Sequence, residues 1–122
     1  MDDRAAFAPE AETCPIELAI RTIGGQWRML VLRSLLMQGA QRYNSLLGTV
    51  AGISSKELTR NLRRLEDAGL VVRESRRQAA SEVDVYTVTQ LGSSLLPAFS
   101  SLGAFGVQLA QARSTSGRAA NA

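Results

Sequence analysis

The chain has 122 residues, a hydrophobic fraction of 45% and a net charge of +3, which suits a single domain with a modest core. We expect neither a membrane span nor a secretory signal, because no apolar run approaches roughly 18 residues and the start "MDDRAAFAPEAE" is acidic. One cysteine excludes an internal disulfide and histidine is absent, so we expect a cytoplasmic protein that lacks the commonest general base.

The charged residues are distributed unevenly along the chain. Residues 54–77 carry seven of the 14 basic residues, whereas residues 1–17 carry five acidic residues and one arginine. Thirteen of the 14 basic residues are arginine, whose planar guanidinium group suits contacts with phosphate and guanine. The middle of the chain is therefore the candidate surface for a polyanionic partner.

The first half of the chain predicts a flexible arm followed by two helices. Residues 1–12, rich in alanine and acid, are the expected arm. The segment "PIELAIRTI" predicts a short helix, with Pro15 in its first turn and Thr13 or Cys14 as its cap. The next segment, "QWRMLVLRSLLMQ", is so apolar that it predicts a central helix packed on several neighbours. Glycine follows each segment and ends the helix.

A helix-turn-helix pattern comes next. The segment "RYNSLLGTV" predicts a short helix, "AGIS" a tight turn, and residues 55–67 a longer helix that Gly69 ends. Ser54 immediately precedes this longer helix and Glu57 follows three residues later, which is the spacing of a capping box.

The helix over residues 55–67 has two contrasting sides. Three leucines lie together on one side, and cationic residues lie on the other. A charged side of this kind is usually an ordinary solvated surface. We favour DNA binding because the motif and the positive charge agree independently. The expected contacts are Ser54 and Ser55 to phosphates, and Lys56, Thr59, Arg60 and Arg63 in the major groove.

Two β-rich runs follow the cationic helix. "LVVRESR" and "VDVYTVT", joined by "RQAASE", predict a β-hairpin with a long, mobile tip. A basic hairpin beside a recognition helix is the wing of a winged helix-turn-helix. We expect Arg73, Arg76 and Arg77 of this hairpin to contact the DNA backbone or minor groove.

The last predicted element is a helix from Gln90 with a long apolar side. Thr89 is its expected cap, and Pro97 predicts a kink or break near Ser94. The polar end, residues 112–122, predicts a disordered tail. The expected fold class is therefore mostly α with a small β-hairpin, arranged as a winged helix-turn-helix domain over residues 13–111.

Several segments together resemble the HxlR-type regulators, a group of MarR-like winged-helix proteins. They are "CPIELAIRTIGGQW", "LTRNLRRLEDAGLVVR" and "YTVTQLGSSLLP", although "GGQW" stands where Gly-Gly-Lys-Trp is more usual. The resemblance implies a sequence-specific transcriptional regulator that binds palindromic operators as a homodimer. It also implies that the terminal helices pair between subunits, and an uncovered apolar surface on a small chain favours the same arrangement. The expected dimerisation residues are Ile16, Ile20, Leu95, Phe99, Leu102 and Phe105.

Cys14 matches the cysteine that senses oxidants or electrophiles in several members of that family. A helix N-terminus favours the thiolate, and Arg21 or Arg28 could approach it, whereas Glu17 opposes it. The alternative is a small, buried and inert residue that caps the helix. Since the chain has no second cysteine, the thiol could react only with its own copy, a small thiol or an electrophile.

Two other classes of function remain as alternatives. One is a winged-helix module that binds protein and not DNA. The other is a single-cysteine reductase or peroxidase, which is disfavoured because no histidine is present to activate the thiol. Glu57, Glu66 and Asp67 lie on differing helix sides, so we expect no metal site, and no cofactor is expected. The sequence therefore predicts a regulator and not an enzyme, with double-stranded DNA and a second copy as partners.

Overall fold

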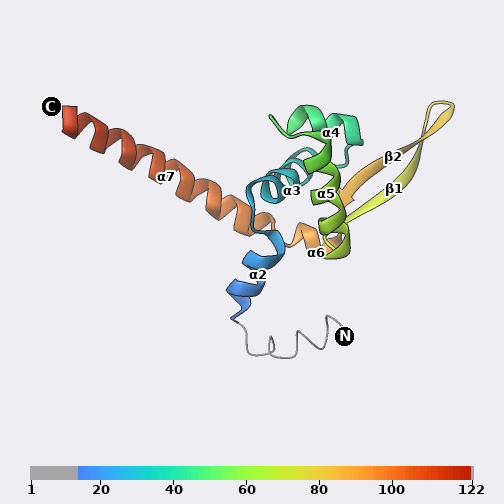
Figure 1. Cartoon of the computed structure of the whole chain (residues 1–122), viewed down its shortest axis with the longest axis horizontal. Helices are drawn as coiled ribbons and strands as arrows, with labels where there is room; N and C mark the ends of the chain where they lie inside the picture. Colours follow the sequence, from blue (N-terminus) through green and yellow to red (C-terminus); the bar gives the residue numbers. More distant parts are fainter. Residues whose placement is uncertain (1–13, 122) are drawn as a thin grey trace.

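The computed structural model describes the backbone of residues 14–121 and the side chains of residues 14–116. The arm predicted over residues 1–12 lies outside this range. The elements in chain order are α2 (Pro15–Ile23), α3 (Gln26–Gln38), α4 (Tyr43–Thr49), α5 (Ser55–Asp67), β1 (Val71–Gln78), β2 (Ser81–Val88), α6 (Gln90–Ser93) and α7 (Leu96–Asn121). The predicted fold class, helical with one antiparallel hairpin, is confirmed (Figure 1).

Helix α3 is central to the core, as its apolar sequence predicted. Val31, Leu32 and Leu35 of this helix are at most 1% exposed. They belong to one hydrophobic cluster with the three leucines on the apolar side of α5 and with residues of α4 and β1. The leucines of α5 are Leu58, Leu62 and Leu65. Their burial turns the opposite side of α5 toward solvent, because a helix buries only one face against a neighbour.

Helices α4 and α5 form the predicted helix-turn-helix. The turn between them contains Gly52 at φ +85°, a left-handed conformation that favours glycine. Ser54 caps α5, since its hydroxyl oxygen accepts a hydrogen bond from the Glu57 amide at 3.1 Å. The capping box is only half formed, because the Glu57 carboxylate accepts hydrogen bonds from Arg60 and Asn61.

The hairpin is longer and its tip tighter than the sequence predicted. Strand pairing runs from Val71 opposite Val88 to Gln78 opposite Ser81, which leaves a two-residue turn. The prediction of a long tip is therefore wrong. The polar residues at the ends of the two strands show no hydrophobic alternation, yet they pair in the ladder up to the two-residue turn. A bridge between Gln41 and Tyr86 attaches the hairpin to the chain before α4.

The C-terminal region differs in part from the prediction. Helix α6 ends at Ser93 and α7 begins at Leu96, so the predicted break near Ser94 is confirmed. Pro97 then lies in the first turn of α7, where a missing N–H removes no helical hydrogen bond. Helix α7 continues to Asn121, whereas residues 112–122 were expected to be disordered. Alanine and arginine in this segment are good helix formers, which accounts for the difference.

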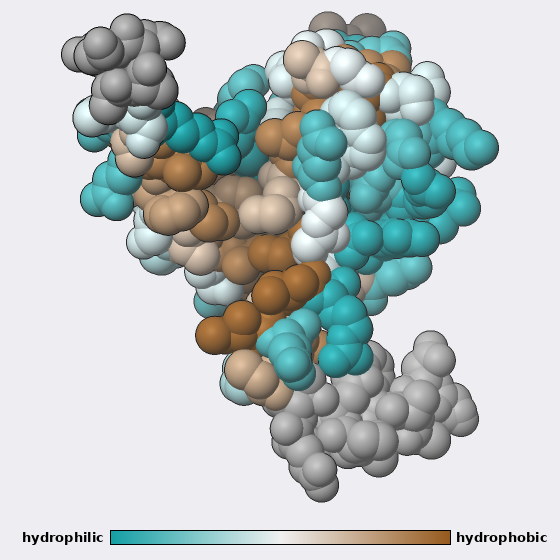
Figure 2. Space-filling view, turned by 60° about the vertical axis from the view of Figure 1, so that its left-hand side comes forward, coloured by the Kyte–Doolittle hydropathy of each residue, from teal (hydrophilic) through white to brown (hydrophobic). Residues whose placement is uncertain are grey.

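An apolar surface remains uncovered on α2 and α7. Helix α2 is amphipathic but buries none of its residues. Figure 2 views the molecule from the side on which α7 lies in Figure 1. A band of hydrophobic side chains runs over this side, with hydrophilic side chains gathered beside it. Among the residues that the structure describes, none of the helices combines the length and hydrophobicity that a membrane crossing requires.

Candidate nucleic-acid interface

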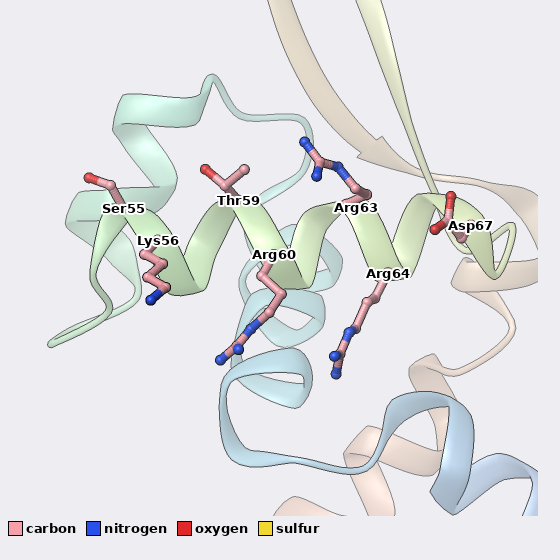
Figure 3. Close-up of a pocket in the computed structure, with 7 residues that line it drawn as sticks. All are labelled: Ser55, Lys56, Thr59, Arg60, Arg63, Arg64 and Asp67. Carbon is pink, nitrogen blue, oxygen red and sulfur yellow. The ribbon is translucent and has the colours of Figure 1, made fainter.

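The outward side of α5 carries two parallel rows of side chains (Figure 3). Each row contains residues four apart, which stack along one side of a helix. We call Ser55, Thr59 and Arg63 the mixed row, and Lys56, Arg60 and Arg64 the cationic row. In Figure 3 the mixed row points toward α4 and the hairpin, and the arginines of the cationic row point toward the α2–α3 turn. The helical wheel predicted this surface but did not separate the two rows.

The cations on this surface are not equivalent. Lys56, Arg63 and Arg64 form no side-chain hydrogen bond or salt bridge with any described residue. Arg60 instead donates to the Glu57 carboxylate at 2.5 Å. This hydrogen bond is the largest cause that lowers the pKa of Glu57, so the carboxylate stays ionised at neutral pH. Arg60 must therefore leave the Glu57 carboxylate before it can bind a phosphate or a guanine.

The mixed row is tied to α4 through Tyr43. The Tyr43 hydroxyl donates to the Ser55 carbonyl oxygen at 2.9 Å and lies 2.7 Å from the Thr59 hydroxyl oxygen. The sequence predicted a short helix over this segment but not these hydrogen bonds. The ring of Tyr43 packs against the core, but its hydroxyl reaches the surface of the next helix.

The two serines lie at the N-terminus of α5, as predicted. Both side chains are exposed. Ser54 uses an oxygen lone pair to cap the helix and keeps its proton for donation. The N-terminus of a 13-residue helix with exposed hydroxyls is a favourable position for a phosphate.

At its C-terminal end the cationic row borders a cleft that the sequence did not predict. The cleft lies where α5 approaches the α2–α3 corner, and it is lined by Arg21, Thr22, Arg28, Arg64, Asp67 and Ala68. Arg28 donates to the Thr22 carbonyl at 2.9 Å and to the Arg21 carbonyl at 3.3 Å, and thereby caps the end of α2. Cationic side chains of α2 and α3 therefore adjoin the outer side of α5.

The three arginines of the hairpin do not form one cluster. Side chains alternate between the two faces of a strand, so Arg73 and Arg77 share a face and Arg76 lies on the other. Arg76 also donates to Glu74 at 3.1 Å. A residue missed from the sequence, Arg42, donates to Gln78 near the hairpin tip at 3.4 Å.

Cys14 is exposed at the start of α2. It occupies the predicted N-cap position of α2 but makes no side-chain capping hydrogen bond, so the alternative of a buried cap holds in its position and not in its burial. Arg28 is held at the opposite end of α2, about 10 Å along the helix axis from Cys14, given about 1.5 Å of rise per residue. The expected approach of Arg28 to the thiol is therefore not observed.

The predicted dimerisation residues divide into two groups. Leu95 and Phe99 are partly buried and pack against the core of their own chain. The other four are exposed: Ile16 by 67%, Ile20 by 62%, Leu102 by 48% and Phe105 by 58%. Within the described residues, no group of three or more His, Cys, Asp or Glu side chains could hold a metal ion.

Comparison with protein families and known sequences gives consistent matches. A profile of the HxlR-like helix-turn-helix family matches residues 22–114. An HTH-type transcriptional regulator from Methanothermobacter thermautotrophicus is 34% identical over 107 residues, which cover 88% of this chain and 80% of that protein. The HTH-type transcriptional regulator YodB from Bacillus subtilis is 30% identical over 99 residues, which cover 80% of this chain and 87% of YodB.

Solved structures show the same arrangement. The redox regulator HypR in its reduced form has a TM-score of 0.73 at 26% identity, covering 84% of this chain and 99% of that chain. Reduced YodB from B. subtilis has a TM-score of 0.68 at 30% identity, covering 79% of this chain and 93% of that chain. These likenesses confirm the winged helix-turn-helix fold.

Proposed function

Because the chain belongs to the HxlR-like helix-turn-helix family of transcriptional regulators, we propose that it binds a palindromic DNA operator as a homodimer. In this proposal α5 of each subunit enters a major groove and the hairpin contacts the adjoining backbone or minor groove. Membership of a regulator family also sets aside the reductase and peroxidase alternatives. The cytoplasmic location expected from the sequence stays a prediction.

The observation that carries the proposal is the outward side of α5. Lys56, Arg63 and Arg64 are exposed on the second helix of a helix-turn-helix, and none of them forms a side-chain hydrogen bond or salt bridge with a described residue. The opposite side is fixed to the core by leucines that are at most 2% exposed. A rigid helix with free cations and serines at its N-terminus suits a major groove and the phosphates beside it.

The uncovered surface of α2 and α7 supports the homodimer. Ile16 and Ile20 of α2, and Leu102 and Phe105 of α7, are large apolar residues exposed to solvent. Exposed patches of this kind usually mark a protein interface, and a second copy offers the same patch in return. A dimer would also supply two recognition helices, which a palindromic site requires about 34 Å apart.

The proposal is tested by selecting duplexes from a pool of randomised sequence with the purified full-length protein. We expect enrichment of a palindromic sequence, bound with an affinity that falls as salt rises. The variant Arg63→Ala should lose affinity, whereas Arg113→Ala, which removes the same charge from an exposed position on α7, should not. Binding no tighter than that of random DNA would contradict the proposal and favour the protein-interaction module.

We further propose that Cys14 makes DNA binding responsive to oxidants or electrophiles. The thiol is exposed, and the related structures include oxidised HypR and both diamide-treated and quinone-bound YodB. The family match begins at residue 22, so it does not itself include Cys14. DNA affinity should change after diamide treatment of the wild-type protein and stay constant in Cys14→Ala. Equal responses of the two proteins would leave the regulator but remove Cys14 as its sensor.

A further inference from the structure

The hydrogen bonds of Tyr43 fix the direction of the Thr59 proton. A carbonyl oxygen can only accept, so the bond to the Ser55 carbonyl uses the single hydroxyl proton of Tyr43. The contact of 2.7 Å between Tyr43 and Thr59 then needs its proton from Thr59. The Thr59 hydroxyl therefore donates inward, toward α4, and both of its lone pairs stay available to accept a hydrogen bond.

This arrangement limits what Thr59 can recognise. In Figure 3 the Thr59 side chain belongs to the open outer surface of α5, between Ser55 and Arg63. In the major groove, adenine N6 and cytosine N4 are donors, whereas guanine O6 and N7 and thymine O4 are acceptors. A hydroxyl that has already given its proton to Tyr43 can accept from the amino groups but cannot donate to the acceptors.

We propose that Tyr43 is a positioning residue that makes Thr59 an acceptor, so that Thr59 selects adenine or cytosine, over guanine or thymine, at one position of the contacted strand in each half-site. The inference rests on the proposed insertion of α5 into the major groove. Tyr43 itself does not touch the base. It acts from α4 by fixing the hydrogen-bond polarity of a side chain on α5, which couples the two helices of the motif to sequence preference.

A purely structural role for Tyr43 makes a different prediction. A bond that only joined α4 to α5 would change stability and overall affinity when removed, but it would leave base preference unaltered. Base preference is therefore the decisive measurement. The chain also supplies a matched control in its other tyrosine, Tyr86, whose hydroxyl has no hydrogen bond with any described residue.

The experiment selects bound duplexes from a randomised pool with the wild-type protein and with Tyr43→Phe, Thr59→Val and Tyr86→Phe. The wild type should prefer adenine or cytosine at one symmetric position by about two- to tenfold, the range expected for one net hydrogen bond. Thr59→Val should abolish that preference. Tyr43→Phe should reduce it to less than about twofold, because the freed hydroxyl can then donate as well as accept. Tyr86→Phe should keep the wild-type preference.

A base analogue tests the same bond without changing the protein, and it is used where the selected base is adenine. Unsubstituted purine in that position removes the amino group, and should weaken wild-type binding by about two- to tenfold. The same replacement should leave Thr59→Val unaffected. Where cytosine is selected, its analogue without the N4 amino group serves in the same way.

The outcomes separate the two proposals. A selected operator whose base preferences are the same for wild type, Tyr43→Phe and Thr59→Val would overturn the role of Tyr43 and leave DNA binding intact. If Tyr43→Phe does not fold, retention of the preference by Thr59→Val is sufficient to overturn it. Failure of the wild type to enrich any sequence would overturn the proposed function and this inference together.

Discussion

Helices α5 and α2 are both amphipathic, but they expose opposite sides. Helix α5 buries three leucines that are at most 2% exposed, whereas α2 leaves Ile16 67% and Ile20 62% exposed. Water satisfies an exposed cationic side until a polyanion replaces it, but it does not satisfy an exposed apolar side. The two surfaces therefore indicate different partners, namely DNA for α5 and another protein surface for α2.

The largest expected effect is a loss of stability when a buried leucine of α5 is truncated. Leu62→Ala should lower the free energy of unfolding by about 2–5 kcal/mol, because it removes core contacts and leaves a cavity. Urea denaturation measures this change. Leu18→Ala, on a side chain that is 44% exposed on α2, should cost much less when the protein is dilute enough to be monomeric. Equal losses of unfolding free energy in the two variants would show that α5 and α2 do not differ in how firmly they pack on the core.

A charge introduced on the exposed apolar side of α2 should weaken the proposed homodimer. Ile20→Glu should raise the dissociation constant of the homodimer by about 100-fold or more, since it places an unpaired carboxylate in an apolar interface. Sedimentation equilibrium measures the constant. Ser81→Glu, at the exposed start of β2, is the matched control and should not alter it. A wild-type protein that stays monomeric at all concentrations would contradict the dimer.

The two rows of α5 should differ in their effect on specific DNA binding. Arg63→Ala should weaken binding to the selected operator by about 1–3 kcal/mol, if Arg63 contacts a base. Arg60→Ala should cost less, because Arg60 first has to leave the Glu57 carboxylate. Titration of labelled operator with each variant measures both affinities. A larger loss for Arg60→Ala would show that the roles of the two arginines are reversed.

The cationic row should contribute mainly through phosphates. Arg64→Ala should weaken binding to all duplexes alike and reduce the slope of log affinity against log salt by about 1. Arg113→Ala should leave that slope unchanged. Strong dependence of the Arg64→Ala effect on sequence would place Arg64 at a base instead.

The smallest expected effect comes from Glu57. Glu57→Gln removes a negative charge and frees Arg60, so affinity for any duplex should rise by about two- to fivefold at low salt. Because Arg60 lowers the pKa of Glu57, the ion pair is intact at neutral pH and is lost only as the pH falls below the ordinary carboxyl range. The gain should therefore be constant across neutral pH. Unchanged or weaker binding by Glu57→Gln would mean that this pair does not restrain Arg60.

Features set by neighbouring residues in the chain were predictable, and features set by distant residues were not. Helical spacing correctly placed the leucines and cations of α5 on opposite sides, and Ser54 at its cap. The Tyr43–Thr59 bond depends on how α4 packs beside α5, which periodicity does not report. The hairpin tip was missed because "RESRRQ" has no alternating pattern, although it pairs throughout. The cleft at Arg28 was missed for the same reason as the Tyr43 bond, because it forms between distant segments.

The most direct test of the outward side of α5 is the salt dependence of DNA affinity in a triple variant. Lys56→Ala, Arg63→Ala and Arg64→Ala together remove the three cations of this side that form no hydrogen bond or salt bridge with a described residue. The slope of log affinity against log salt should decrease in magnitude by about 1.8 relative to wild type, from about 0.9 for each of the phosphate contacts of Lys56 and Arg64, since Arg63 is assigned to a base. A slope and affinity equal to those of the wild-type protein would show that DNA does not bind to this side of α5.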